Sequence, residues 1–377
     1  MKVRNKILCF IIFSLILSGC RDRLDLDKSS IILTYGLDID DDNNFIVYQS
    51  NPVFDEDVTK KNKVIYGVVH SIQEESNIFN SRNDGLAVYG KTQINLFGEK
   101  LLNNQGIQNI LDPLFRDAKS SSNARMVVVK GSVSSIMNLD FEDKSRLSVY
   151  LANLINVGRQ SNLTVDTTLQ RFHTQILDRG ITPILSEVKE SENNIIITGS
   201  ALLDNSGVHR MSIDHMDNKY LVMLQNKAEI PVLLNLQISP TDVYQQGTDL
   251  DNEKKSISLD VKRINHDIKT KYINGLFDFN VKLKLTVSIS EKTFNIKKEE
   301  IPKKLTNELE RTMEKQMLEL INKIKSQQLD PIGFGQYARA YQYKHWKKIE
   351  DSWPEEFAKA NVNVTVHLKI RNQGVIQ

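Results

Sequence analysis

The chain begins with a short apolar run that ends in a cysteine. Residues 7–17 are almost entirely apolar, and the basic residues Lys2, Arg4 and Lys6 precede them. A basic segment followed by such a run is typical of an export signal. Roughly eleven residues are also too few to cross a bilayer, which needs about 20. We therefore predict a signal peptide over residues 1–19 and no membrane span there.

The motif Leu17-Ser18-Gly19-Cys20 makes this prediction more specific. It is typical of a lipobox, in which diacylglycerol alkylates the cysteine thiol and the cysteine becomes the acylated mature N-terminus. Two lipid signals are needed for stable anchoring, because a single chain holds a protein only marginally. We predict lipidation at Cys20. One alternative is a soluble secreted protein; another, a cytosolic protein with a buried apolar N-terminus, is disfavoured by the basic residues.

Cysteine usage limits how the mature chain can be stabilised. Its only cysteines are Cys9, which would leave with the signal, and Cys20, which would carry the lipid. No thiol would remain for a disulfide, a zinc site or a nucleophile. Stability must therefore come from packing.

Composition indicates an ordinary globular protein. The 377 residues are 40% hydrophobic and 25% charged, which predicts two or three domains. Loss of the three basic signal residues changes the formal net charge from +2 to about −1, and nucleic-acid binding needs concentrated Lys and Arg. We expect no nucleic-acid partner. No later apolar run approaches 18 residues, so we also expect no transmembrane helix.

Hydrophobic periodicity alternates along the first half of the chain. Apolar runs predict strands over residues 31–38, 45–49, 64–72, 89–97, 126–129 and 195–203. Spacings of three and four, or polar helix-like composition, predict helices over 76–88, 99–102, 107–115, 141–157, 168–177 and 214–225. Pro183 indicates that residues 181–188 form an edge strand or that a strand begins near the proline, and residues 187–194 suit a hairpin tip. This alternation predicts a mixed α/β or α+β fold.

The second half has the clearest patterns. Residues 279–289 alternate between apolar and polar, which predicts a half-buried antiparallel strand, and residues 362–370 repeat the pattern. A long C-terminal helix is predicted over residues 302–327, with an apolar stripe that includes Met313 and Met317. Such methionines can line an adaptable groove, but core filling is favoured. We expect a lipidated leader over 20–29, an N-terminal α/β region over 30–194 and a C-terminal α/β region over 195–377, with a possible subdomain boundary near 250.

An acidic cluster near the start invites a calcium interpretation. Asp38, Asp40 and Asp42 occupy the first, third and fifth places of an EF-hand-like loop. Its sixth place, which needs glycine, is Asn43, and its twelfth, which needs glutamate, is Gln49. We favour a plain turn between two strands.

No catalytic or cofactor motif stands out. The chain lacks the phosphate-binding, metalloprotease, serine-hydrolase and dinucleotide-binding signatures. Single histidines such as His173 and His367 suit packed or surface positions better than metal binding. The glycosylation pattern at Asn162 is attributed to chance. We expect no enzyme, metal or cofactor, although a surface hydrolase could be built from convergent carboxylates or a Ser-His pair distant in sequence.

Motifs in the last fifty residues resemble a known family. Asp-Pro-Ile-Gly-Phe-Gly at 330–335 is followed by Trp-Lys-Lys-Ile at 346–349, Trp-Pro-Glu-Glu-Phe at 353–357 and a closing strand that ends at 370–376. Together with segments 35–38, 199–203 and 220–224, they resemble the Ger(x)C family of spore germination lipoproteins. The family commonly has Trp and then Asp after the lipid-bearing cysteine, whereas this chain has Arg21 and Asp22.

The resemblance implies a non-enzymatic C subunit of a nutrient germinant receptor. It would be held by lipid on the outer face of the spore inner membrane, beside integral membrane A and B subunits, and would help respond to amino acids, sugars or nucleosides. It also implies several domains with mixed sheets flanked by helices. The alternative from another class is a surface lipoprotein that binds a small-molecule solute directly. Such proteins usually have two repeated lobes, and no internal repeat is found here.

Overall fold

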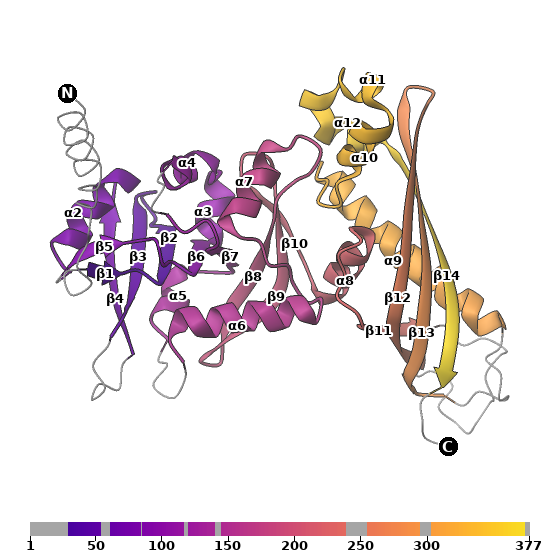
Figure 1. Ribbon diagram of the computed structural model, residues 1–377, viewed down its shortest axis with the longest axis horizontal. Helices are drawn as coiled ribbons and strands as arrows, with labels where there is room; N and C mark the ends of the chain where they lie inside the picture. Colours follow the sequence, from indigo (N-terminus) through magenta and orange to yellow (C-terminus); the bar gives the residue numbers. More distant parts are fainter. Residues whose placement is uncertain are drawn as a thin grey trace, which may run out of the picture.

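The computed structural model describes residues 29–53, 61–83, 85–116, 120–139, 145–238, 255–294 and 303–373. These residues form an elongated molecule with one large sheet toward each end (Figure 1). We call the part built on the first sheet the first unit and the part built on the second sheet the C-terminal unit. The predicted signal peptide 1–19, the lipidation site Cys20 and the possible boundary near 250 lie outside the described residues. No helix in the described ranges is both long enough and apolar enough to cross a membrane.

The first sheet has eight strands in the order β10-β9-β8-β7-β6-β2-β3-β4. Its centre, β2, β6, β7 and β8, is parallel, and antiparallel strands extend it on both sides. The strands are β2 (Thr34–Ile39), β3 (Phe45–Pro52), β4 (Asn62–Val69), β6 (Ile94–Gly98), β7 (Arg125–Val129), β8 (Ile184–Ser191), β9 (Asn194–Leu203) and β10 (His209–Ile213). A separate parallel pair joins β1 (Ser29–Ile31) to β5 (Leu86–Val88).

Helices cover both faces of the first sheet. The core of one face includes residues of α3 (Glu99–Asn104), α4 (Gln108–Arg116) and α7 (Leu169–Leu177). The core of the other includes α5 (Val133–Met137) and α6 (Leu147–Gln160). Successive residues of β7 point alternately to the two cores: Met126 and Val128 to the first, Val127 to the second. This confirms the expectation, from its continuous apolar sequence, that this strand is buried on both faces.

The second sheet has the order β11-β12-β13-β14. Its strands are β11 (Val232–Ile238), β12 (Lys255–Ile273), β13 (Leu276–Lys292) and β14 (Asn361–Gln373). Asn274 and Gly275, with φ of 52° and 82°, form the tight turn between β12 and β13, a geometry that favours Asn-Gly. The helix α9 (Lys303–Ser326) packs on the sheet, and all seven buried residues of its apolar stripe are 0% exposed.

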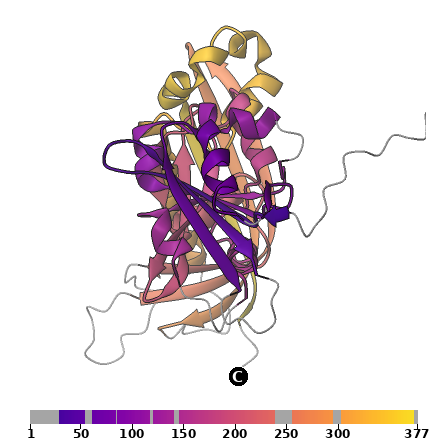
Figure 2. The same cartoon turned by 90° about the vertical axis from the view of Figure 1, so that its left-hand side faces the viewer.

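The remaining helices complete this second core. They are α8 (His215–Leu224), α10 (Phe334–Tyr341), α11 (Tyr343–Trp346) and α12 (Trp353–Lys359), with a short 3₁₀ turn at Glu350–Ser352. The first unit also contains a 3₁₀ turn at Ile72–Glu74 and the short α2 (Glu75–Asn80). Figures 1 and 2 show α10 to α12 gathered at one end of the second sheet. There Tyr272 of β12 stacks on His345 with ring centroids 3.9 Å apart. The two tryptophans of the family-like motifs, Trp346 and Trp353, are 1% exposed and lie in this core.

Several predicted elements are corrected. β14 pairs parallel with β13, so the repeated alternation marks a half-buried strand but not an antiparallel one. β8 lies inside the sheet, so the edge-strand alternative is wrong, and Pro183 simply precedes the strand. The helix predicted over 76–88 ends at Asn80 and β5 follows. Strand β12 was not predicted.

The proposed division between residues 194 and 195 stays a prediction. It falls after Asn194, the first residue of β9, just past the β8–β9 turn in which Glu192 and Asn193 have positive φ. The first sheet therefore includes strands on both sides of it. The confirmed fold class is α+β with mixed sheets, helices and a long C-terminal helix.

We predict that Met317→Ala destabilises the C-terminal unit by about 2–5 kcal/mol, because it leaves a cavity in a close-packed core. Met317 is 0% exposed and belongs to the same core as both tryptophans. Tryptophan fluorescence during denaturant unfolding therefore reports this unit. Lys315→Ala, two residues away and on the exposed side of α9, should change stability by less than about 0.5 kcal/mol. Equal effects of the two substitutions would contradict the core assignment of the methionines.

Candidate functional site

The family-like segment at 330–335 is organised around a buried carboxylate. Asp330 is 0% exposed. Its Oδ1 accepts from the N–H groups of Gly333 (2.8 Å) and Phe334 (3.0 Å), and its Oδ2 accepts from Gly335 N–H (2.8 Å) and Trp353 Nε1 (2.9 Å). Burial raises the pKa of Asp330 to about 6, while these four donors oppose that rise. The carboxylate thus caps the start of α10 and fixes α12 against it.

The same residue joins the two units of the molecule. Thr182, just before β8, donates its N–H to the carbonyl of Asp330 (3.0 Å), and Asp330 N–H donates to Thr182 Oγ1 (3.0 Å). Beside this pair, a Cβ on Gly335 would lie 2.6 Å from both Gly180 Cα and Trp353 Nε1. Only glycine fits at such a close backbone approach.

An ion pair extends this contact. Asp178, after α7, accepts from Arg339 Nη1 and Nη2 of α10 at 3.0 and 3.1 Å, and Gln336 Nε2 donates to it at 3.0 Å. Arg339 and Gly180 N–H lower the pKa of Asp178, outweighing the effect of burial. We call this set of contacts, from Asp178 to Thr182 on one unit and from Asp330 to Arg339 on the other, the junction.

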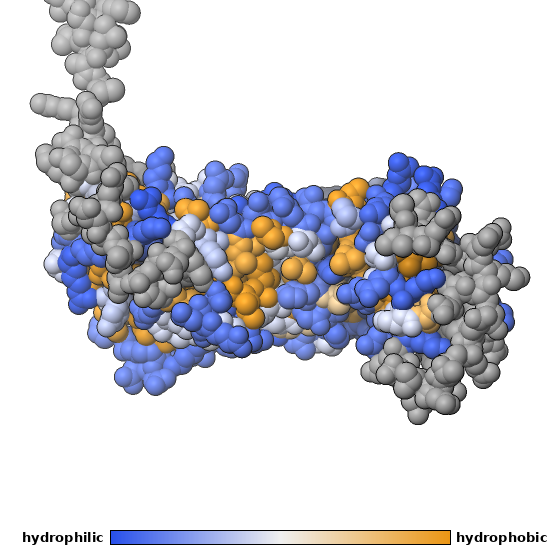
Figure 3. Space-filling view, turned by 90° about the horizontal axis from the view of Figure 1, so that it is seen from below, coloured by the Kyte–Doolittle hydropathy of each residue, from blue (hydrophilic) through white to orange (hydrophobic). Residues whose placement is uncertain are grey.

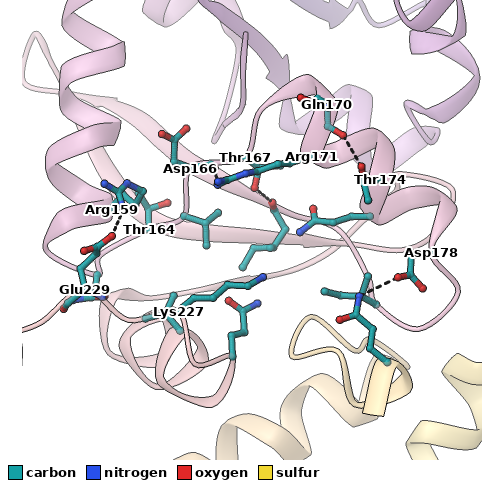
Figure 4. A pocket seen from close by; sticks show the side chains of 18 residues that line it. Arg159, Thr164, Asp166, Thr167, Gln170, Arg171, Thr174, Asp178, Lys227 and Glu229 are labelled. Atoms are coloured by element: carbon teal, nitrogen blue, oxygen red, sulfur yellow. Dashed lines mark hydrogen bonds and ion pairs between the residues drawn. The ribbon is translucent and has the colours of Figure 1, made fainter. Parts of the chain in front are cut away.

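A pocket of about 720 Å³ lies beside the junction (Figure 4). Its walls come from the end of α6 and the loop after it, from α7, from the segment after α8, and from Gln336 of α10. Val165, Ile181, Ile184 and Val222 supply apolar surface. The size and mixed lining are those of a small-molecule site.

Most charges in the pocket are already paired. Arg159 is paired with Glu229, Asp178 with Arg339, and Asp166 with Arg125 at 3.0 Å. Arg171 and Lys227 differ, because neither has an acidic partner in the described part of the chain. Arg171 Nη1 donates instead to the backbone carbonyl of Asp166 (3.0 Å). Figure 4 shows Lys227 reaching into the pocket opposite Arg171. Burial, together with Arg171, lowers the pKa of Lys227.

The residue of the glycosylation pattern has a structural role in the same wall. Asn162 is 2% exposed, its Nδ2 donates to Glu229 O (2.7 Å), and its Oδ1 accepts from Glu229 N–H (2.8 Å). Its φ of 58° also suits asparagine. Its amide ties the segment after α8 to the end of α6.

The acidic cluster forms a turn, as favoured from the sequence. Asp40 Oδ1 accepts from the N–H groups of Asp42 (2.9 Å) and Asn44 (2.8 Å), which closes the β2–β3 hairpin. Asp38 is instead buried, with Val133 N–H donating to it at 2.8 Å. Within the described ranges, no group of three or more His, Cys, Asp or Glu side chains is placed to hold a metal.

A Ser-His pair does exist on the first sheet. His209 Nε2 lies 3.1 Å from Ser212 Oγ, and His209 Nδ1 lies 3.0 Å from Asn103 Oδ1. However, Ser212 donates its hydroxyl proton to Glu187, which also accepts from Thr198 (2.5 Å). The imidazole is therefore not the base for this hydroxyl, and we interpret the cluster as a polar network that binds β8, β9 and β10 together. The histidines singled out earlier are a packed residue, His173 against Phe115, and an exposed one, His367.

An exposed apolar face lies over α6. From Leu147 to Gly158 this helix has no charged residue, and its outer stripe includes Val149 and Val157, which are 36% and 58% exposed. Figure 3, viewed from the side of α6, shows apolar residues gathered near the middle of this face. This uncharged face is a candidate interaction surface.

The fold of these two units occurs in a protein of known structure. The crystal structure of the GerBC protein superposes with a TM-score of 0.57 at 15% identity, covering 90% of this chain and 97% of that one. Family models then match in order: the spore germination protein N-terminal domain over residues 22–190, and the spore germination B3/GerAC-like C-terminal domain over 198–374. The chain therefore belongs to the GerAC-like family of spore germination proteins, which is not a known family of enzymes.

Curated relatives agree over the full length. The chain is 20% identical to spore germination protein KC of Bacillus subtilis strain 168, covering 96% of this chain and 93% of that protein. It is 21% identical to spore germination protein B3 (100% of both) and 22% identical to spore germination protein A3 (99% and 98%), both from the same organism. The family resemblance seen in the sequence is confirmed.

The position of Asp330 predicts a pH-dependent stability. The pKa of Asp330 is about 6 in the folded chain and near 3.8 in the unfolded chain. Its contribution to the free energy of unfolding is therefore fully present below about pH 4 and is lost as pH rises through 6. This change amounts to about 3 kcal/mol. Asp330→Asn should remove that part of the pH dependence of the unfolding free energy. It should also destabilise the fold by about 1–3 kcal/mol at pH 7, because buried N–H donors lose their acceptor.

The measurement is denaturant unfolding at several pH values between 4 and 7. Asp351→Asn is the control, since Asp351 makes only an exposed ion pair with Arg179, which is worth about 0–1 kcal/mol. An identical pH slope in the Asp330→Asn and unmodified chains would refute the role assigned to this carboxylate.

Proposed function

We propose that this chain is the lipid-anchored C subunit of a nutrient germinant receptor. The observation that carries the proposal is the ordered match of both family domains over almost the whole chain after Cys20. The lipobox motif adds the anchor, which would hold the protein on the outer face of the spore inner membrane. The chain would act there as a docking and signalling module without catalytic activity.

We propose further that the uncharged face of α6 docks a membrane-embedded subunit of the receptor. The nine residues from Cys20 to Lys28 can span at most about 30 Å, so the anchor keeps the first sheet and its helices close to the bilayer. A membrane-embedded subunit close to the first sheet would present an apolar protein surface to it. The uncharged stripe around Val149 and Val157 matches that chemistry.

The anchor is tested by Cys20→Ala. We expect the substituted protein to move from the spore membrane fraction to the soluble fraction, and the germination response to its nutrient to be lost, because no acyl chains remain. Cys9→Ala, which leaves the lipobox intact, should behave like the unmodified protein. A Cys20→Ala protein that stays membrane-bound and functional would overturn the anchor.

The docking face is tested by Val157→Asp. A charge at the centre of an apolar contact should lower co-purification of membrane partners from spores by tenfold or more, while changing the unfolding free energy by no more than about 0.5 kcal/mol. Val68→Asp is the matched control, since Val68 is 51% exposed on β4, away from α6. Equal co-purification with both variants would exclude α6 as the docking face.

A further inference from the structure

The pocket beside the junction has an electrostatic imbalance. Its acidic residues Asp166, Asp178 and Glu229 each have a cationic partner. Lys227 and Arg171 have none in the described chain, and both line the pocket with exposed side chains. Two cations without a counter-charge in one pocket favour a bound anion.

Several neutral polar side chains around the pocket already make hydrogen bonds within the chain. Thr167 donates to Ile184 O (2.6 Å), Thr174 to Gln170 O (3.1 Å), and Gln225 to Pro331 O (2.7 Å), so these polar groups are already engaged. The volume of about 720 Å³ fits a small molecule and excludes a folded partner.

From these observations we infer that the pocket binds a small organic anion that carries a carboxylate or a phosphate. Lys227 and Arg171 hold the anionic group. Because the walls come from both units of the molecule, the bound anion also bridges them. This inference requires neither the lipid anchor nor a membrane partner.

The test is calorimetric titration of the mature full-length chain in detergent. The probes are L-malate, L-glutamate and glucose 6-phosphate, with neutral glucose as the reference, at low salt because screening weakens charge attraction. We expect at least one anion to bind with a dissociation constant below about 1 mM and glucose not to bind. Carboxylate and phosphate probes separate the two anion types. Absence of binding by all three anions at 10 mM would overturn the inference.

Substitutions locate the binding. Lys227→Met, which keeps the length but removes the charge, should weaken binding tenfold or more, which corresponds to about 1.4 kcal/mol. Lys227→Arg should retain most of it. Lys304→Met, at an exposed lysine on α9, is the control and should bind as the unmodified chain does. Binding that is unchanged by Lys227→Met would place the anion elsewhere and refute this site.

This result is independent of the receptor assignment. The same titration with the Cys20→Ala chain should give unchanged affinity, since Cys20 precedes the folded units. Failure of anion binding with normal membrane anchoring would reject only the pocket. Normal anion binding without anchoring would reject only the proposed lipid attachment.

Discussion

The molecule depends on one buried carboxylate that gathers four N–H donors. Asp330 collects three consecutive backbone N–H groups and the indole of Trp353. A buried acceptor of this kind is tolerated only when its hydrogen bonds are made. Because Trp353 belongs to the second core and Thr182 to the loop before β8, this single group sets the end of α9, the start of α10 and their position against the first sheet.

The pocket follows from that constraint. Gln336 and Arg339 lie on the helix that Asp330 caps, and they contact Asp178 on the other unit. Gly180 and Gly335 approach each other closely at the same place. Contacts outside the pocket thus connect its walls, which is the support that a binding site needs.

Sequence patterns predicted the elements whose burial is regular. The stripe of α9, the alternation of β13 and the continuous apolar run of β7 each follow one period, and each is present in the structure. β12 was missed because a register shift at residues 261–263 changes the phase of its alternation, and because the polar His266 and Thr270 occupy inward positions after it. The parallel pairing of β14 could not be inferred, since parallel and antiparallel strands share the same period.

The site was largely beyond prediction because tertiary contacts create it. Asp330 and its glycines stand in a family-like motif, but Gly335 is needed for its contact with Gly180 about 150 residues earlier in the chain. The pocket combines Arg171, Gln175 and Lys227, whose spacing in sequence matches no motif. That these residues line one pocket, and that two of them lack an acidic partner, can be seen only in the three-dimensional structure.

The pocket and the proposed docking face share one helix. Arg159, at the end of α6, forms part of the pocket wall through its pair with Glu229, and Val157 lies two residues before it on the exposed face. A ligand that altered the Arg159–Glu229 pair would act directly on the helix that presents this face. The proposed anion site and the proposed docking face are therefore next to each other on α6.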